Sequence, residues 1–352
     1  MTPLLEARQV TKAFGGGVFD RTATLALDTF SLAVAGDRPT ITAVVGESGS
    51  GKTTLARLLL GLTTPTHGQV LYHGQDLQRM AAADWRAFRR DVQVIFQDPY
   101  EVYNPFYRVD HVLTTPVAKF KLAASKAAAR ALIDDVLQAV GLRPEETLGR
   151  FPHQLSGGQR QRVMVARALL LQPRLILADE PVSMVDASLR ATILGALQRM
   201  NQERGISLIY ITHDLATAYQ ISTNIVVLYR GSVAEAGDVE LVVKSPRHPY
   251  TQLLIASIPV ASVDRTWTNE TVAAPALPGA GLAGCKFADR CPAATPACLL
   301  APPPLVQPDR YRAVACYLYR GAPVVPADAL GSVFAPPAAP PLASASGTLP
   351  SP

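Results

Sequence analysis

The sequence predicts an α/β fold in which a mostly parallel sheet carries a phosphate-binding loop. An apolar run at 41–45 leads into the glycine-rich segment 46–53, and a helix-like run follows at 54–60. Further along, apolar strands alternate with helical segments, which is typical of a parallel sheet covered by helices on both faces. With 352 residues, 48% of them hydrophobic, the chain is long enough for one large domain and a smaller one.

The charge of the chain favours no particular partner. A net charge of +5 without a long Lys/Arg block permits contact with a membrane surface or with nucleic acid but does not argue for either. Residues 1–10 lack an apolar core of signal-peptide length, and no window reaches the roughly 18 apolar residues of a spanning helix. We therefore expect a cytosolic protein, or one held at a membrane by its partners.

Alternating strands and turn residues account for the first hundred positions. Residues 4–11 and 25–35 alternate, and glycines between them mark a turn. After the loop and its helix, the sequence predicts a strand and turn at 68–74, a helix at 84–90 and a strand at 92–96.

The glycine-rich segment is built to hold an anion. Gly46, Gly49 and Gly51 let the backbone curl so that its N–H groups point inward. The helix that starts near Lys52 adds the positive end of its dipole. Lys52 is placed to reach the β- and γ-phosphates, and the Thr53 hydroxyl is placed to ligate Mg²⁺. The expected nucleotide-binding set is Gly46, Glu47, Ser48, Gly49, Ser50, Gly51, Lys52, Thr53 and Thr54.

A helical insertion separates two parts of the α/β core. Pro105 and Pro116 break its start, and an Ala-rich helix at 125–140 has apolar residues at helical spacing. A second helix follows at 160–171. The remaining predicted elements are strands at 175–178, 206–211 and 225–229, the last closing the core, and a helix at 187–204.

Four polar residues follow strand ends, where ligands bind in open α/β sheets. Asp179 is placed to hold Mg²⁺ through water, and Glu180 to polarise the attacking water. Gln97 can bridge Mg²⁺ and water, and His213 can hydrogen-bond the γ-phosphate. Taken singly, Gln97 also suits a polar turn and His213 a helix cap. Together with the phosphate loop, the four predict hydrolysis of a nucleoside triphosphate.

This motif set resembles that of the ATP-binding-cassette (ABC) ATPases over residues 4 to about 240. The most specific element is the signature Leu155-Ser156-Gly157-Gly158-Gln159. The resemblance implies an antiparallel β part beside the parallel sheet, and a helical subdomain at about 100–170. It also implies that the signature binds ATP held by a second cassette in a head-to-tail dimer. Phe14 would stack on adenine, although its position alone suits a core or turn aromatic equally.

One departure from the family lies after Glu180. The family usually reads Pro-x-Ser-Ala-Leu-Asp there, whereas this chain has Pro181-Val182-Ser183-Met184-Val185-Asp186. The segment normally lies at the dimer interface, so the change leans toward a homologue rather than a copy as the partner cassette. The catalytic residues are intact, and we expect an active ATPase that uses ATP and Mg²⁺.

A narrower resemblance concerns the region beyond the core. The segments similar to the C-terminal extension of oligopeptide, dipeptide and nickel importer ATPases are Pro246–Thr251, Gly284–Phe287, Arg290–Pro292 and Val314–Cys316, together with Cys298. This implies a subunit on the cytoplasmic face of the membrane with two transmembrane permease partners and, indirectly, an extracytoplasmic peptide-binding protein. Short peptides are the expected cargo, and nickel or another small solute is the alternative because other subunits select the cargo.

Two further functions are weighed against import. Soluble ABC ATPases that act on DNA or ribosomes usually have coiled-coil inserts or two cassettes, whereas this chain has one phosphate loop and no long heptad run. We therefore expect no nucleic acid partner. A non-hydrolysing regulatory cassette is disfavoured by the presence of Glu180 and His213.

Four cysteines cluster near the C-terminus, at Cys285, Cys291, Cys298 and Cys316. In a cytosolic chain, clustered thiolates favour a metal over disulfides. By count they suit a [4Fe–4S] cluster or an all-thiolate zinc site, although the tight zinc knuckle is absent. Free thiols buried under loops are the alternative. The family resemblance favours iron–sulfur.

The expected organisation has three regions. Residues 1–255 form the ABC ATPase domain, and residues 256–320 form the extension with four cysteines. The Ala/Pro-rich stretch 321–352 has almost no charge and is predicted to be a disordered tail.

Overall fold

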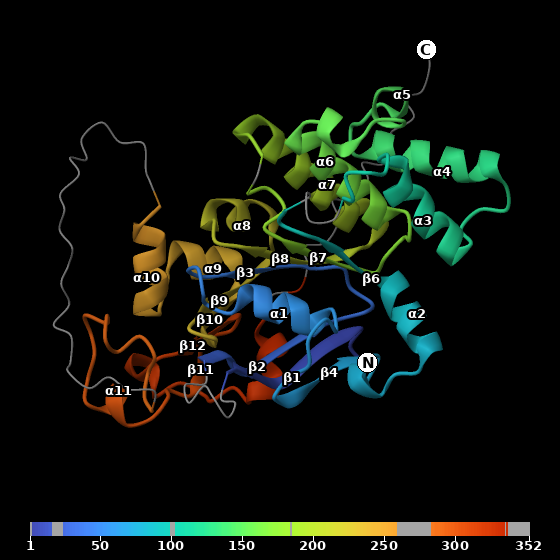
Figure 1. The fold of residues 1–352 in the computed structure, drawn as a ribbon. Coiled ribbons are helices and arrows are strands. Elements are labelled where there is room, and N and C mark those ends of the chain that lie inside the picture. The colour runs from blue at the N-terminus through green and yellow to red at the C-terminus, as the bar shows by residue number, and fades with distance from the viewer. Residues whose placement is uncertain are drawn as a thin grey trace, which may run out of the picture.

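The computed structural model describes residues 2–15, 24–98, 103–183, 185–258, 283–334 and 336. Two sheets form its centre, with most helices gathered above the larger sheet (Figure 1). The larger sheet has the order β11 (Leu305–Asp309), β12 (Arg312–Ala315), β10 (Ser232–Asp238), β9 (Asn224–Tyr229), β3 (Ile41–Val45), β8 (Ser207–Thr212), β7 (Leu175–Asp179) and β6 (Val92–Ile95). The α/β fold class is confirmed.

The middle of the larger sheet is parallel and buried on both faces. Strand β3 pairs in parallel with β8 and β9, and β7 pairs in parallel with β6 and β8. Ile176 and Ala178 pack into one apolar core, while Leu175 and Leu177 pack into the other. Because side chains alternate along a strand, a fully apolar run is what a strand between two cores requires.

The smaller sheet is antiparallel and covers the first helix. Its strands have the order β2 (Thr24–Val34), β1 (Leu5–Phe14), β4 (His67–Tyr72) and β5 (Gln75–Asp76). Helix α1 (Lys52–Leu59) contacts strands of both sheets, and its Leu55, Leu58 and Leu59 are buried. The phosphate loop is therefore held between the two sheets.

Helices cover the other face of the larger sheet. They are α3 (Asp110–Phe120), α4 (Lys126–Ala139), α5 (Pro144–Thr147), α6 (Gly157–Leu169), α7 (Ala187–Arg204) and α8 (Leu215–Ile221). Helix α2 (Ala82–Asp91) instead packs on the α1 side, where its Phe88 joins the same apolar core as α1. Pro116 lies inside α3 and does not end the helix. It is buried with Leu113 and Val117, and this packing offsets the missing backbone hydrogen-bond donor. Among the described ranges, no helix is long and apolar enough to span a bilayer.

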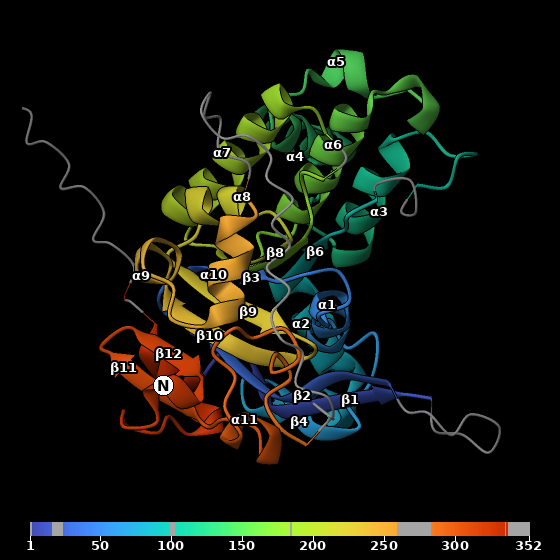
Figure 2. The same ribbon diagram turned by 90° about the vertical axis from the view of Figure 1, so that its left-hand side faces the viewer.

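Strand β9 does not close the sheet, which corrects the expectation for residues 225–229. Strand β10 pairs antiparallel with β9 and with β12, and β12 pairs with β11. Strand β10 is not recognisable in the sequence because Glu235 and Gly237 are untypical of a buried strand. In the structure, Glu235 is nevertheless fully buried. Helices α9 (Val239–Lys244), α10 (Pro249–Ala256) and α11 (Ala297–Leu300) lie beside these strands, as seen from the side in Figure 2.

The first part of the expected disordered tail is ordered. Residues Ala327–Val333 form a 3₁₀ helix that packs against β2, and Val325, Leu330 and Val333 are buried. Three well-spaced apolar side chains suffice to hold an otherwise Ala/Pro-rich segment, which composition alone does not reveal. Residues 335 and 337–352 of the tail lie outside the described residues.

Candidate active site

The phosphate loop follows β3 directly and has a strained backbone that only glycine adopts freely. Gly46, Gly49 and Gly51 have φ angles of 154°, 79° and 104°. A Cβ atom on Gly46 would lie 2.2 Å from the Leu228 carbonyl oxygen. At Gly51 a Cβ atom would lie 2.3 Å from the carbonyl oxygen of residue 26. The loop therefore fits closely between β9 and β2.

Lys52 opens α1 and turns back into the loop. Its Nζ donates to the carbonyl oxygens of Gly46, at 2.7 Å, and Glu47, at 2.9 Å. Burial lowers the pKa of Lys52, while the carboxylates of Glu180, Asp179 and Glu47 act to raise it. A buried ammonium group at a helix N-terminus is suited to bind an anion. Ser48, Gly49 and Thr53 are exposed beside it, whereas Ser50 is buried and Thr54 half-buried.

Glu180 follows β7 and is held by two side chains. Gln97 Nε2 donates to its Oε2 at 3.0 Å, and His213 Nδ1 lies 2.8 Å from its Oε1. Glu180 has a φ angle of 47°, which is unusual for a residue with a side chain. Its N–H donates to the Ile211 carbonyl at 2.8 Å, which keeps this conformation in place. Strain at such a residue is often associated with function.

Asp179 is the more buried of the two adjacent carboxylates. Burial first and the neighbouring Glu180 charge second raise its pKa to about 6, against the opposing effect of Lys52 and Arg57. A buried carboxylate beside a second one is suited to a divalent cation, which would favour its charged form. The donor set of Asp179, Gln97 and the Thr53 hydroxyl therefore suits Mg²⁺, a hard cation that prefers oxygen ligands.

The structure distinguishes the alternatives that were open for Gln97 and His213. The cap of α8 is Asp214, whose Oδ1 accepts from the residue 216 N–H at 2.9 Å, so His213 is not the cap. Gln97 reaches across to Glu180 instead of bonding only within its own turn. Both side chains thus converge on one carboxylate.

The signature Leu155–Gln159 lies on a separate part of the molecule. Ser156 caps α6 and forms a capping box with Gln159, with distances of 3.2 Å and 2.9 Å. A Cβ atom on Gly158 would lie 2.5 Å from Leu189 Cδ1, so glycine permits close packing of α6 on α7. In both ribbon views α6 is among the upper helices, away from α1 (Figures 1 and 2).

Phe14 and the altered segment after Glu180 are described only in part. Phe14 ends β1 with 46% of its surface exposed, and the Lys12 ammonium lies 5.0 Å from its ring centre. An exposed ring at this edge is available for stacking. Met184 lies outside the described residues, whereas Val185 is buried and Asp186 precedes α7.

All four cysteines line one cavity of about 470 Å³ in the C-terminal region. Burial, with a smaller effect of the neighbouring thiols, raises the pKa of Cys285 and Cys291. The same causes raise the pKa of Cys316 to about 11. Within the described residues, however, no three such donors converge on a position for a metal ion. The donor set suits a thiolate-bound group, but the side chains are not gathered around a single ion.

Two residues at this loop were missed by sequence reasoning. Tyr250 accepts a hydrogen bond from the Glu47 N–H at 2.9 Å, and Arg290 pairs with the Glu47 carboxylate at 3.0 Å. The only signal for them was the likeness of Pro246–Thr251 and Arg290–Pro292 to a family extension. That likeness does not say what the segments contact.

Comparison with known proteins places these features in one family. Residues 30–183 match the family model described as ABC transporter, and residues 234–298 match the model described as oligopeptide/dipeptide transporter, C-terminal region. A putative oligopeptide transport ATP-binding protein, YkfD of Bacillus subtilis, is 38% identical over 91% of this chain and 97% of the relative. The chain belongs to the ABC transporter ATPases.

Other ABC proteins support this membership. The oligopeptide transport ATP-binding protein OppF of Escherichia coli is 40% identical over 74% of this chain and 79% of the relative. Among solved structures, the dimeric cassette MJ0796 bound to ADP and Pi has a TM-score of 0.59 and 28% identity, covering 67% of this chain and 98% of that chain. The ABC ATPase fold, and with it the use of ATP, is therefore shown.

Proposed function

We propose that this ABC ATPase binds and hydrolyses ATP to drive the uptake of oligopeptides or dipeptides through partner transmembrane subunits. The observation that carries this proposal is the joint presence of a phosphate loop, a Glu180 carboxylate held by Gln97, and a C-terminal region of the oligopeptide/dipeptide transporter type. Relatives named for oligopeptide transport span nearly the whole chain.

Hydrolysis is assigned to residues around Glu180. The loop N–H groups and Lys52 would bind the phosphates, and Thr53, Asp179 and Gln97 would hold Mg²⁺, which would supply charge neutralisation of the phosphates. Glu180 accepts a proton from the attacking water, and Gln97 and His213 orient its two oxygens. Phe14 stacks on the adenine ring.

A second cassette completes the site. The signature lies apart from the phosphate loop of the same chain, so we assign Ser156, Gly157, Gly158 and Gln159 to ATP held by a partner cassette in a head-to-tail dimer. The dimeric state of MJ0796 supports this assignment. In the proposed complex, the two cassettes lie on the cytoplasmic face of the membrane under two permease subunits, which receive peptides from an extracytoplasmic binding protein.

A pull-down from detergent-solubilised membranes tests the assembly. Tagged chain should recover two multi-span subunits and a peptide-binding protein, identified by mass, while the untagged chain should recover neither. Recovery of ribosomal or DNA-repair proteins without a membrane protein would overturn import. Uptake of a labelled tripeptide against labelled Ni²⁺ in vesicles of the recovered complex then decides the cargo, with Glu180→Gln as the inactive control.

For the cysteine cavity, we propose a [4Fe–4S] cluster. The four thiols that line the cavity are soft ligands of the kind that hold iron–sulfur clusters, which supports this proposal. Anaerobically purified protein should contain iron and acid-labile sulfide. Cys298→Ser should lose both, whereas Thr295→Ala, which alters a neighbour of that thiol, should keep them. Stoichiometric zinc, or no metal, would contradict the proposal.

A further inference from the structure

We infer that Arg290, in the C-terminal region, is a positioning residue that holds the phosphate loop through Glu47. The inference rests on the proposed function, because it concerns how the ATP site is kept in shape. Arg290 Nη1 and Nη2 donate to Glu47 Oε2 and Oε1 at 3.0 Å and 3.1 Å. A two-pronged contact between a guanidinium group and a carboxylate fixes orientation as well as distance.

Aromatic rings restrict the Arg290 side chain. Its Cζ lies 5.6 Å from the Phe287 ring centre and 5.9 Å from that of Tyr229, and its Nη1 lies 3.4 Å from the Tyr229 hydroxyl. Tyr229 and Phe287 pack edge to face with ring centres 5.3 Å apart. A guanidinium group beside two rings loses less freedom when it pairs with a carboxylate. Arg290 thus presents a fixed fork to the loop.

A second contact from the same side fixes the loop backbone. The Glu47 N–H donates to the hydroxyl of Tyr250, whose side chain is fully buried at the start of α10. Glu47 is therefore held by its side chain and by its backbone. Since Lys52 Nζ donates to the carbonyl oxygens of Gly46 and Glu47, a shift of Glu47 reaches the group assigned to the phosphates.

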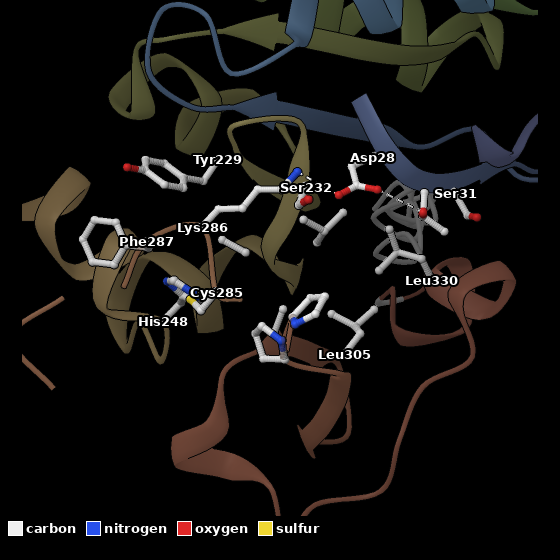
Figure 3. Close-up of a pocket in the computed structure, with 16 residues that line it drawn as sticks. Asp28, Ser31, Tyr229, Ser232, His248, Cys285, Lys286, Phe287, Leu305 and Leu330 are labelled. Atoms are coloured by element: carbon white, nitrogen blue, oxygen red, sulfur yellow. Dashed lines mark hydrogen bonds and ion pairs between the residues drawn. The ribbon is translucent and has the colours of Figure 1, made fainter. Parts of the chain in front are cut away.

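The segment that carries Arg290 is itself anchored to both sheets. Lys286 pairs with Asp28 of β2 at 2.9 Å, and Asp289 pairs with Arg230, next to β9, at 3.0 Å. Figure 3 shows Lys286 between Tyr229 and Asp28, at a second cavity of about 290 Å³ that Cys285 also lines. These pairs are partly exposed and add little stability, so their value is geometric. The anchored segment gives Arg290 a fixed base.

The test compares Arg290, which connects the segment to the loop, with Arg230, which follows β9 and pairs with the segment. Arg290→Gln and Glu47→Gln should each weaken binding of the fluorescent analogue mant-ATP to the purified full chain about tenfold. Each should raise KM for ATP more than it lowers kcat. Arg230→Gln also breaks a pair with the segment but does not touch the loop, so it should leave both values unchanged. Arg290→Lys keeps the charge without the fork and should restore binding partly.

The double variant Glu47→Gln/Arg290→Gln decides whether the two residues act as a unit. It should bind mant-ATP as the single variants do, because both changes break one contact. Additive losses, or an equal loss in Arg230→Gln, would overturn the inference. So would a lower melting temperature of Arg290→Gln with unchanged mant-ATP affinity, because Arg290 would then only attach the segment. A wild-type chain that binds no mant-ATP would overturn the proposed function, and this inference with it.

Discussion

The phosphate loop and the C-terminal region differ in the contacts that shape them. The loop is shaped by contacts between near neighbours, such as Lys52 with Gly46 and Glu47, and is attached to the distant Tyr250 and Arg290 through Glu47. In the C-terminal region the polar contacts join residues far apart in the chain, as between Glu235 and Arg312. The comparison teaches that an anion site can be encoded by a short motif, whereas the attachment of an extension depends on long-range contacts.

The largest expected effect concerns the ATP site alone. If Glu180 is the general base, Glu180→Gln should lower ATP turnover by roughly 10²–10⁴-fold, the usual contribution of such a group. Mant-ATP affinity should stay within a few-fold of the wild type, since the phosphate contacts remain. Steady-state phosphate release and fluorescence titration measure the two values. Glu203→Gln, an exposed change on α7, is the control, and normal turnover in Glu180→Gln would contradict the mechanism.

The next effect tests the long-range contacts of the other region. Glu235 is fully buried, accepts from the N–H groups of Arg247 and His248 at 3.0 Å and 2.9 Å, and lies 3.6 Å from buried Arg312. Glu235→Ala leaves that guanidinium group without this carboxylate, which should cost about 3–5 kcal/mol of unfolding free energy.

Urea unfolding measures this loss, and an exposed acid on the next helix provides the control. Glu240→Ala removes a surface pair with Lys244 and should not shift the urea midpoint. Equal midpoints for Glu235→Ala and Glu240→Ala would mean that the buried pair does not secure β10 to β12.

A smaller effect tests the segment that follows the extension. Leu330 is buried in the 3₁₀ helix that packs against β2 of the smaller sheet. Leu330→Ala should therefore cost roughly 2–5 kcal/mol of unfolding free energy. Leu300→Ala, at a position that is 79% exposed, should cost little. Thermal unfolding compares the two variants. Equal melting temperatures would show that the 3₁₀ helix does not contribute to the fold.

The smallest effect is a change in pH dependence. Burial lowers the pKa of His248 to about 4, and its Nδ1 caps α10 by accepting from the Tyr250 N–H at 3.0 Å. The unfolded chain takes up this proton near pH 6.5 and the folded chain only near 4, so stability from this residue is lost as pH falls between these values.

His248→Asn keeps an acceptor at the cap without a group that titrates. The difference in unfolding free energy between wild type and this variant should therefore shrink or reverse, by up to about 3 kcal/mol, from pH 7 to pH 4. Comparing the two chains removes the opposite contribution of Glu235, whose pKa is raised by burial. A difference that does not vary with pH would mean that folding does not lower the pKa of His248.

Sequence reasoning succeeded where chemistry and periodicity are local. Strand β7 and helix α7 were predicted with bounds that agree within one residue, because a continuous apolar run and a long uninterrupted helix leave few alternatives. Gln97, Glu180 and His213 were predicted at strand ends, and the structure brings their side chains together.

It failed where a contact partner is distant. Strand β10 contains a buried glutamate, and a glutamate is expected at the surface unless a partner such as Arg312 is known to lie beside it. The 3₁₀ helix around Leu330 has the composition of a disordered tail, and only its packing against β2 shows that it is ordered. Arg290 and Glu47 are 243 positions apart, and neither the phosphate loop nor the segment around Arg290 contains a pattern that predicts their pairing.

The antiparallel pairing of β10 with β12 means that the C-terminal region covers what would otherwise be an edge strand of the larger sheet. Glu235, Ala236 and Gly237 face Val314, Ala313 and Arg312 across this pair. A chain that stopped at residue 255 would leave one side of β10 without a backbone partner. Open strand edges recruit other strands, so such a shortened chain should self-associate even though its phosphate loop is intact.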